Sequence, residues 1–347
     1  MCANCSIPIS LSFDPRAAIH ISQILAGFHL LAQSGWCTLT VRQTRRDTSH
    51  FHYVLAETAG KSIVFDVHDN GRQPPVLPAD HYFRRSACTP QEALGLNYHV
   101  SCPGNPYQTM VPAGCKDPAA RHVLLRKALA HLPAGSLSDR WVYPGQIAQP
   151  AGHPQEESIL FLTRTWFPLE EHPGLREEQI VAAHPQLALV LQMDETRAAL
   201  IRLLRREYGR RAVCGFARTP FAVKHWPSLV VPHALTQKRA YLAVMRRARV
   251  CLTTTGLHGS TGWKFGEYAA AAKAFVAEPP QYHLPGGFAA NANYLPFHTP
   301  EQALSQTEHL RADAIFREEM QRRNAAYYQA FLRPDILVKN ALARALE

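Results

Sequence analysis

Residues 249–279 read RVCLTTTGLHGSTGWKFGEYAAAAKAFVAEP, and this stretch decides the fold. The run from Val250 to Thr255 is apolar and β-branched and ends at Gly256, which is typical of a buried strand that enters a tight turn. The loop up to Gly262 is rich in small residues, and the alanine-rich segment from Tyr268 to Ala272 is a strong helix former. The stretch therefore predicts a strand, a glycine-rich loop and a helix in succession.

This order of elements favours the binding of an anion. Free backbone N–H groups and the positive end of the helix dipole meet at the start of the helix. Lys264 adds a positive charge there, and the Glu267 carboxylate suits the vicinal hydroxyls of a ribose because it accepts two hydrogen bonds. We interpret the loop as a nucleotide site. The alternative is a plain strand–helix unit with a solvated lysine and glutamate, since the loop is neither a Walker loop nor a standard dinucleotide fingerprint.

Three segments resemble the C-terminal half of bacterial GT-B glycosyltransferases, a group related to the spore-coat-type and group 1 sugar transferases: GLHGSTGWKFGEYAAAAKAFVAEP, NYLPFHTPEQAL and YYQAFLRPD. A weaker similarity extends to KSIVFDVHDNG, DHYFRRSA, LGLNYHV and SILFLTRTWFP, so it touches both halves of the chain. The resemblance implies an α/β fold with two Rossmann-like domains facing a cleft. It also implies a hexosyltransferase that moves a sugar from a nucleotide-diphosphate donor to an acceptor in surface polysaccharide, lipopolysaccharide or protein glycosylation.

The resemblance assigns roles to two positions of the loop. In the group 1 pattern a glutamate before an alanine-rich helix contacts the nucleotide ribose, and Glu267 matches it. A second glutamate, eight positions earlier in that pattern, is associated with the donor sugar. Here that position is Gly259, with His258 beside it. This departure leaves open the donor sugar and whether the anomeric configuration is retained or inverted.

The length of the chain and its pattern of short elements predict two domains. With 347 residues the chain is long enough for two separate cores. We expect an acceptor-side α/β domain at 1–155, a nucleotide-sugar domain at 156–320, and C-terminal helices at 321–347 that cross back to the first domain by analogy with GT-B proteins. The boundary is placed in the loop-like segment from Pro133 to Pro154. No apolar run is long enough to span a membrane and the N-terminus lacks a signal-peptide pattern, so we expect a cytoplasmic protein, with the inner face of the membrane as an alternative.

Individual elements follow from hydrophobic periodicity and from turn residues. The alternation of strands and helices predicts parallel sheets. Strands are expected at Ile7–Phe13, Thr38–Arg42, His52–Leu55, Ser62–Phe65, His81–Phe83, Leu94–Val100, Ser158–Thr163, Ala212–Phe216 and Ser228–Val231. Helices are expected at Ala17–Ser34, Ala119–Leu132, Glu195–Tyr208, Thr236–Ala248, after Thr299, at Arg311–Phe331 and at Asp335–Leu346.

Charge and cysteine content limit the partners. The formal net charge is +10, but the arginine pairs are spread along the chain, which is typical of solvated faces and argues against nucleic acid as a partner. The excess of positive charge suits an anionic nucleotide donor or an anionic membrane surface that carries a lipid-linked acceptor.

The sequence offers little evidence for a metal site. Cys2 and Cys5 form the one C-x-x-C pair, and a zinc site normally needs four ligands. No D-x-D motif is present to hold Mg²⁺, so we predict transfer without a metal and without a cofactor.

Ligands of open α/β sheets bind beyond the carboxyl ends of the strands, and this rule selects the candidate site. For the donor it selects Arg164, Gly259, Ser260, Thr261, Gly262, Lys264 and Glu267, and for the acceptor side it selects Asp14. His68 and Asp69 are candidates for acid–base catalysis, since an imidazole can take a proton that a carboxylate helps to orient. His258 is a further catalytic candidate. Ordinary surface arginines and loop histidines produce the same pattern, and 18 histidines are present.

Three classes of function remain open on these residues. The first is the glycosyltransferase, which would bind a nucleotide sugar and a carbohydrate, lipid-linked or protein acceptor. The second is a nucleotide-sugar epimerase or hydrolase on the same architecture, which needs no second substrate. The third is a non-catalytic binder of nucleic acid or of a membrane surface, for which the net charge is the motive.

Overall fold

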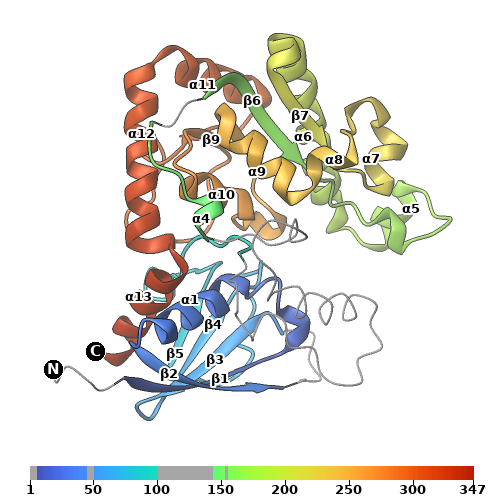
Figure 1. Ribbon diagram of the computed structural model, residues 1–347. Helices are drawn as coiled ribbons and strands as arrows, with labels where there is room; N and C mark the ends of the chain where they lie inside the picture. Colours follow the sequence, from blue (N-terminus) through green and yellow to red (C-terminus); the bar gives the residue numbers. More distant parts are fainter. Residues whose placement is uncertain (1–5, 45–50, 101–143, 153–154) are drawn as a thin grey trace.

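The computed structural model describes residues 6–44, 51–100, 144–152 and 155–347, and two five-stranded sheets organise them (Figure 1). The chain is thus mixed α/β, as the alternation of elements predicts. Three expectations lie outside the described residues: the Cys2–Cys5 pair, the helix Ala119–Leu132 and most of the boundary segment 133–154.

The first sheet is mixed, so the prediction of a parallel sheet is wrong for one of its strands. In the order β2-β1-β3-β4-β5, the central β3 runs antiparallel to both of its neighbours, while the other two pairings are parallel. The reason is the two-residue turn at Ala59 and Gly60, whose φ angles of 50° and 75° are those of a tight hairpin. The strands are β1 (Ile7–Phe13), β2 (Cys37–Gln43), β3 (Tyr53–Thr58), β4 (Lys61–Asp66) and β5 (His81–Arg84).

The second sheet is parallel throughout, with the order β10-β9-β8-β6-β7. The first strand of this sheet along the chain is β6. The next strand, β7, pairs with one edge of β6, and β8 pairs with its other edge, followed outward by β9 and β10. The order therefore reverses between β6 and β8, which is the topological switch point where doubly wound sheets bind ligands. The strands are β6 (Glu156–Thr163), β7 (Ala212–Phe216), β8 (Ala248–Thr253), β9 (Phe275–Ala277) and β10 (Leu295–Pro296).

Most of the helices follow β6 along the chain. The helices longer than five residues are α1 (Ser22–Gln33), α5 (Glu177–Ala183), α6 (Leu187–Tyr208), α7 (Pro220–His225), α9 (Lys238–Arg247), α10 (Trp263–Ala270), α11 (Pro300–Ala312), α12 (Ala314–Tyr327) and α13 (Pro334–Leu346). Shorter helical turns are η1 (Pro15–Ala17), α4 (Pro144–Ile147), η2 (Leu169–Glu171), η3 (Gly209–Arg211), η4 (Pro227–Leu229), α8 (His233–Thr236), η5 (Leu257–Gly259) and the π-helical η6 (Tyr328–Leu332). Thr299 caps α11, since its hydroxyl accepts a hydrogen bond from the Gln302 N–H at the start of the helix.

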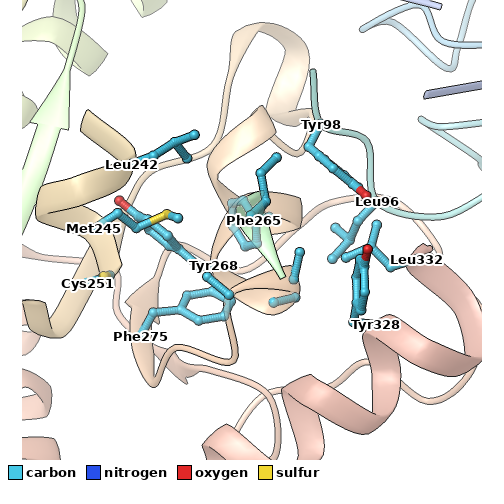
Figure 2. Packing of buried hydrophobic residues seen from close by; sticks show 14 of the residues in the cluster. Leu96, Tyr98, Leu242, Met245, Cys251, Phe265, Tyr268, Phe275, Tyr328 and Leu332 are labelled. Carbon is cyan, nitrogen blue, oxygen red and sulfur yellow. The ribbon is translucent and has the colours of Figure 1, made fainter. Parts of the chain in front are cut away.

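Two expected strands are not formed. Ser228–Val231 is mostly the turn η4, with a single β-bridge between Val230 and Phe216. Leu94–Val100 is irregular, although Leu96, Tyr98 and Val100 are all buried. Their alternation with less apolar residues reflects burial in the core around α10 and not the pairing of a strand. Figure 2 shows Leu96 and Tyr98 near Phe265 in this core. The backbone approaches so closely that a Cβ on Gly266 would lie 2.7 Å from the Asn97 carbonyl oxygen.

The last helix packs against the first sheet's half of the molecule. Figure 1 shows α12 running down from the second sheet and α13 lying beside α1. Leu337, Val338 and Leu342 of α13 belong to the same buried core as α1 and the first sheet. Gln23 Nε2 also donates a buried hydrogen bond of 2.9 Å to the Leu332 carbonyl, just before α13 begins. The two ends of the chain therefore share one core.

A glycine in α1 permits this close packing and gives the first prediction. A Cβ on Gly27 would lie 2.3 Å from the Pro334 carbonyl oxygen and 2.6 Å from Val338 Cγ2. Gly27→Ala should therefore lower the free energy of unfolding by about 1–3 kcal/mol through overpacking, even though alanine favours helices. Chemical denaturation would measure this. Gly145→Ala is the control, because its Cβ would meet no atom of the described residues within 4 Å. Equal stability of the two variants would contradict the packing of α13 on α1.

Candidate functional site

A cavity of about 500 Å³ is lined by residues from both halves of the chain. From the first half come His20, Asp69 and Arg85, which follow β1, β4 and β5, together with His99. From the second half come residues just beyond the carboxyl ends of β6, β7 and β8, including Arg164, Ala217 and Thr255. The cavity thus lies at the switch point of the second sheet, and its size is that of a small-molecule site.

A buried ion pair on α6 holds the loops at the switch point. Arg197 is 3 % exposed and binds both loops: its Nη1 donates to the Arg164 carbonyl at 3.0 Å, and its Nη2 donates to the Thr255 carbonyl at 2.8 Å. Its Nε donates to Thr254 Oγ1 at 2.9 Å. Asp194, fully buried one helical turn earlier, lies 3.5 Å from Arg197 Nη1. The pair fixes the ends of β6 and β8 relative to each other.

The Asp194 carboxylate also binds the backbone of the loop after β6. It accepts hydrogen bonds from the backbone N–H groups of Trp166 and Phe167, with Oδ2 at 2.8 and 2.9 Å. Burial raises the pKa of Asp194, although these N–H groups and Arg197 oppose the shift. The carboxylate therefore holds the backbone of this loop in place and does not line the cavity.

The glycine-rich loop turns sharply before α10 and leaves the start of that helix uncapped. His258 and Gly259 have φ angles of 57° and 70°, and the Gly256 N–H closes the turn by donating to the Ser260 carbonyl at 2.7 Å. The N-cap residue of α10 is Gly262, which has no side chain, and no side-chain cap is formed within the part of the chain that the structure describes. Beside it, the Thr261 hydroxyl is buried and has no hydrogen-bond partner among the described residues. An uncapped helix start next to an unsatisfied buried hydroxyl suits a polar ligand.

Two lysines and a glutamate line the cavity where α9 meets α10. Lys238 forms an ion pair with Glu267, whose side chain is almost fully buried. Burial alone would raise the pKa of Glu267, but Lys238 and then Lys264 outweigh it, so the pKa lies below its ordinary value and the carboxylate is charged. Lys264 Nζ lies 4.6 Å from the centre of the Tyr241 ring. Burial lowers the pKa of Lys264, and the nearby Glu267 opposes this shift.

The charges of the cavity are unequally paired. Arg197, Lys238 and Arg85 each have a carboxylate partner: Asp194, Glu267 and Asp69. Within the described part of the chain, neither Lys264 nor Arg164 forms an ion pair; each lies 4.6 Å from the centre of an aromatic ring, Tyr241 and Trp166 respectively. The cavity therefore offers two basic side chains to an anionic ligand.

The loops of the first half reach the glycine-rich loop through Asp69. Ser260 Oγ donates to Asp69 Oδ1 at 3.0 Å, and Asp69 also pairs with Arg85. Burial lowers the pKa of Arg85 to about 10, so the guanidinium is still charged at neutral pH. Asp69 is thus shared between the two halves of the chain.

The structure brings most of the predicted site residues together. Seven line the cavity: Asp69, Arg164, Ser260, Thr261, Gly262, Lys264 and Glu267. The other four are absent from its lining: Asp14, His68, His258 and Gly259.

Those four residues have other surroundings. Asp14 is buried and holds Arg16 through both its carboxylate oxygens. His68 Nδ1 accepts a hydrogen bond from the Asn70 N–H at 3.2 Å, and the side chain lines a much smaller pocket. His258 is exposed, and its carbonyl accepts from Tyr282 Oη at 3.0 Å. At Gly259 a Cβ would lie 2.2 Å from Gln281 Cδ.

Sequence reasoning misses several lining residues that carry polar chemistry, among them His20, Arg85, Arg197, Lys238 and Tyr241. For Arg197 a signal exists. It falls three and four residues before Leu200 and Ile201, on the apolar face of the helix, and Asp194 lies three residues before it. A pair of opposite charges on an apolar helix face indicates a buried ion pair. For the other four no comparable signal is present, because their positions depend on the packing of the two halves.

Other classes of site are absent from the described residues. No group of three or more His, Cys, Asp or Glu side chains in residues 6–44, 51–100, 144–152 and 155–347 is arranged to hold a metal ion. None of the helices described is both long and apolar enough to cross a membrane. Comparisons with protein-family models and with curated proteins give no match to this chain. The resemblance to GT-B glycosyltransferases stays a prediction.

The second prediction concerns the buried pair on α6. Arg197→Ala should lower the free energy of unfolding by about 3–5 kcal/mol, because it leaves the Asp194 charge buried without its partner. Arg202→Ala on the exposed face of the same helix should change it by less than about 0.5 kcal/mol. Denaturant titration of both variants would measure the difference. If both substitutions changed the free energy of unfolding by a similar small amount, the ion pair between Asp194 and Arg197 would not hold the switch-point loops.

Proposed function

We propose that the chain is a GT-B glycosyltransferase that moves a sugar from a nucleotide-diphosphate donor to an acceptor hydroxyl. The observation that carries the proposal is a pair of basic side chains, Arg164 and Lys264, which line the cavity together with the start of α10 and form no ion pair with any described residue. The two α/β halves, with residues of both lining one cavity, support the GT-B arrangement.

A diphosphate leaving group would give Lys264 and Arg164 an anionic partner. Sugar transfer from a nucleotide diphosphate requires stabilisation of the negative charge that develops on the leaving group. Lys264 and Arg164 supply two positive charges, and the N–H groups at the start of α10 supply the helix dipole. Because burial disfavours the charged form of Lys264, an anion placed beside it would recover that cost. The Thr261 hydroxyl would gain a hydrogen-bond partner from the same ligand.

The nucleoside end of the donor would lie against Glu267. Its carboxylate is charged, lines the cavity and is oriented by Lys238, so it can accept hydrogen bonds from the two ribose hydroxyls. A carboxylate here would repel a phosphate, whereas Lys264 on the same helix attracts one. The order of the two residues along α10 therefore supports a donor that lies along the helix start.

The third prediction is a selective gain of stability with one nucleoside diphosphate. Thermal denaturation would be followed with UDP, GDP, ADP and dTDP, and with CMP. A ligand that binds only the folded state at 100 times its dissociation constant adds about 2.7 kcal/mol. We expect one nucleotide to stabilise the protein, and Glu267→Gln and Lys264→Met to lose most of this effect.

Surface substitutions of the same kinds serve as controls. Glu195→Gln and Lys339→Met lie at exposed positions and should keep the full stabilisation. If no nucleotide stabilises the wild-type protein, the proposed function is wrong. If a nucleotide does so equally well in both site variants, the donor lies elsewhere. Consumption of a nucleotide sugar without any acceptor would instead indicate an epimerase or hydrolase.

The fourth prediction concerns metal dependence. Since Lys264, Arg164 and the start of α10 would stabilise the diphosphate, transfer should keep its rate in EDTA. A nucleotide-sugar consumption assay with and without the chelator would measure this. Loss of the activity in EDTA, with recovery on addition of Mn²⁺ or Mg²⁺, would contradict the prediction.

A further inference from the structure

The first half of the chain contributes a pair of opposite charges to the cavity wall. Asp69 and Arg85 follow β4 and β5, line the cavity and form an ion pair with each other, so their formal charges cancel. His20 lines the same wall. Burial lowers the pKa of His20, and the charges of Arg85 and His68 add to the shift, so the imidazole is uncharged at neutral pH. These polar groups therefore face the ligand without net charge, unlike those of the second half.

Both members of the pair keep capacity for further hydrogen bonds. The Asp69 side chain is 41 % exposed, and Oδ1 makes both its contact with Arg85 and its hydrogen bond with Ser260. Within the described residues this leaves Oδ2 for a ligand. The ion pair uses Nη2 of Arg85, whose Nε is buried and has no hydrogen-bond partner in the same part of the chain. An acceptor beside a donor fits two adjacent hydroxyls, because each hydroxyl both donates and accepts.

Aromatic rings line the cavity where α10 meets the first half. The centre of the Trp263 ring lies 5.9 Å from that of His20 and 5.7 Å from that of His99, with 26° between the planes of Trp263 and His99. At this separation two nearly parallel rings overlap only in part, and Trp263 is half-buried. Trp263 begins α10, directly before Lys264. The rings thus offer a flat apolar surface where the proposed diphosphate site meets the first half.

We propose that this wall is the acceptor subsite and that it takes an uncharged hexopyranose, with Asp69 and Arg85 at two adjacent hydroxyls and Trp263 against the C–H face of the ring. The proposal rests on the glycosyltransferase function inferred above. One face of a pyranose presents C–H groups and its rim presents hydroxyls, so a single sugar ring uses the flat surface and the ion pair together. Trp263 then contacts the acceptor, although it belongs to the helix that carries Lys264 and Glu267.

The pairing of charges disfavours the other acceptors that the sequence leaves open. A phosphate or carboxylate would meet the negative charge of Asp69 and would have to displace it from Arg85. A serine or threonine side chain of a protein has one hydroxyl and no ring face, and a lipid chain has no pair of hydroxyls. The accepting ring can still stand at the end of a longer glycan or glycolipid, because only that ring enters the subsite.

The fifth prediction is that the protein, saturated with the nucleoside diphosphate that stabilises it, binds simple uncharged glycosides. Saturation-transfer NMR would be recorded with the methyl glycosides of glucose, galactose, mannose and N-acetylglucosamine. We expect at least one of them to bind, with the strongest transfer to the ring C–H protons that pack on Trp263. Methyl glucuronide, glucose 6-phosphate and N-acetylserine amide should bind about 10-fold more weakly or not at all, since each loses one of the contacts described above.

Substitutions locate the binding. Asp69→Asn should lower the affinity for the glycoside by about 10-fold or more, because a charged hydrogen-bond acceptor becomes a neutral amide. Asp80→Asn, at an exposed position outside the cavity, is the matched control and should keep the affinity. Trp263→Leu should lose the binding, whereas Trp263→Phe keeps a flat ring and should retain most of it. Stabilisation by the nucleoside diphosphate, measured on each variant, shows that the variant is folded.

Several outcomes would overturn the acceptor subsite while the proposed function stands. These are tighter binding of an acidic sugar than of any uncharged glycoside, no glycoside binding to a protein that the nucleoside diphosphate stabilises, and unchanged affinity in both Asp69→Asn and Trp263→Leu. An equal loss of affinity in Ser260→Ala would assign the effect to the contact between the halves. If Trp263→Leu weakened stabilisation by a nucleotide sugar and left glycoside binding intact, Trp263 would face the donor sugar instead.

Failure of the proposed function gives a different result. In that case no nucleoside diphosphate stabilises the wild-type protein, and the acceptor role of this wall fails with the function, whatever glycoside binds.

Discussion

The site depends first on the ion pair between Asp194 and Arg197 inside α6. A buried charge is costly unless it is paired and hydrogen-bonded, and here all three guanidinium nitrogens and both carboxylate oxygens have partners. Those partners belong to the loops after β6 and β8. The loops must therefore keep one relative position if the pair is to stay satisfied. The switch point of the second sheet is consequently a rigid part of the cavity wall, and the ends of both strands are held ready for a ligand.

The opposite wall depends on contacts between the two halves. Asp69 and Arg85 follow strands of the first sheet, yet Asp69 accepts a hydrogen bond from Ser260 in the glycine-rich loop. Tyr282 makes a second link, since its hydroxyl donates to the His258 carbonyl and accepts from the Gly71 N–H at 3.4 Å. Because α13 shares a core with α1, the end of the chain ties the same two parts together. A change in the relative position of the halves would therefore change the loop that faces the ligand.

The sequence predicts the local features and misses those that depend on distant contacts. The strand before Gly256, the loop and the start of α10 are visible because apolar runs, glycines and alanines act within a few residues. Lys264 and Glu267 follow from that local order. The direction of β3 is missed because the turn at Ala59 and Gly60 lacks the Asn-Gly or Asp-Gly pair that is the strong sequence signal of a hairpin. The irregular course of Leu94–Val100 cannot be read from its alternating pattern, since α10 rather than a sheet buries those side chains. His20 and Arg85 enter the cavity through the packing of the two halves, which no short window of sequence contains.

Gly259 shows how the backbone limits the chemistry of the loop. The group 1 pattern has a glutamate at this position, but here φ is 70°, a value that strains any residue with a Cβ, and the Gln281 side chain occupies the space that a Cβ would need. A carboxylate at this point would require both a different turn and a displaced Gln281. The Ser260 hydroxyl, next in the chain, is meanwhile directed to Asp69 of the first half. At the position where the group 1 pattern has a donor-side carboxylate, the loop of this chain therefore makes a contact between the halves.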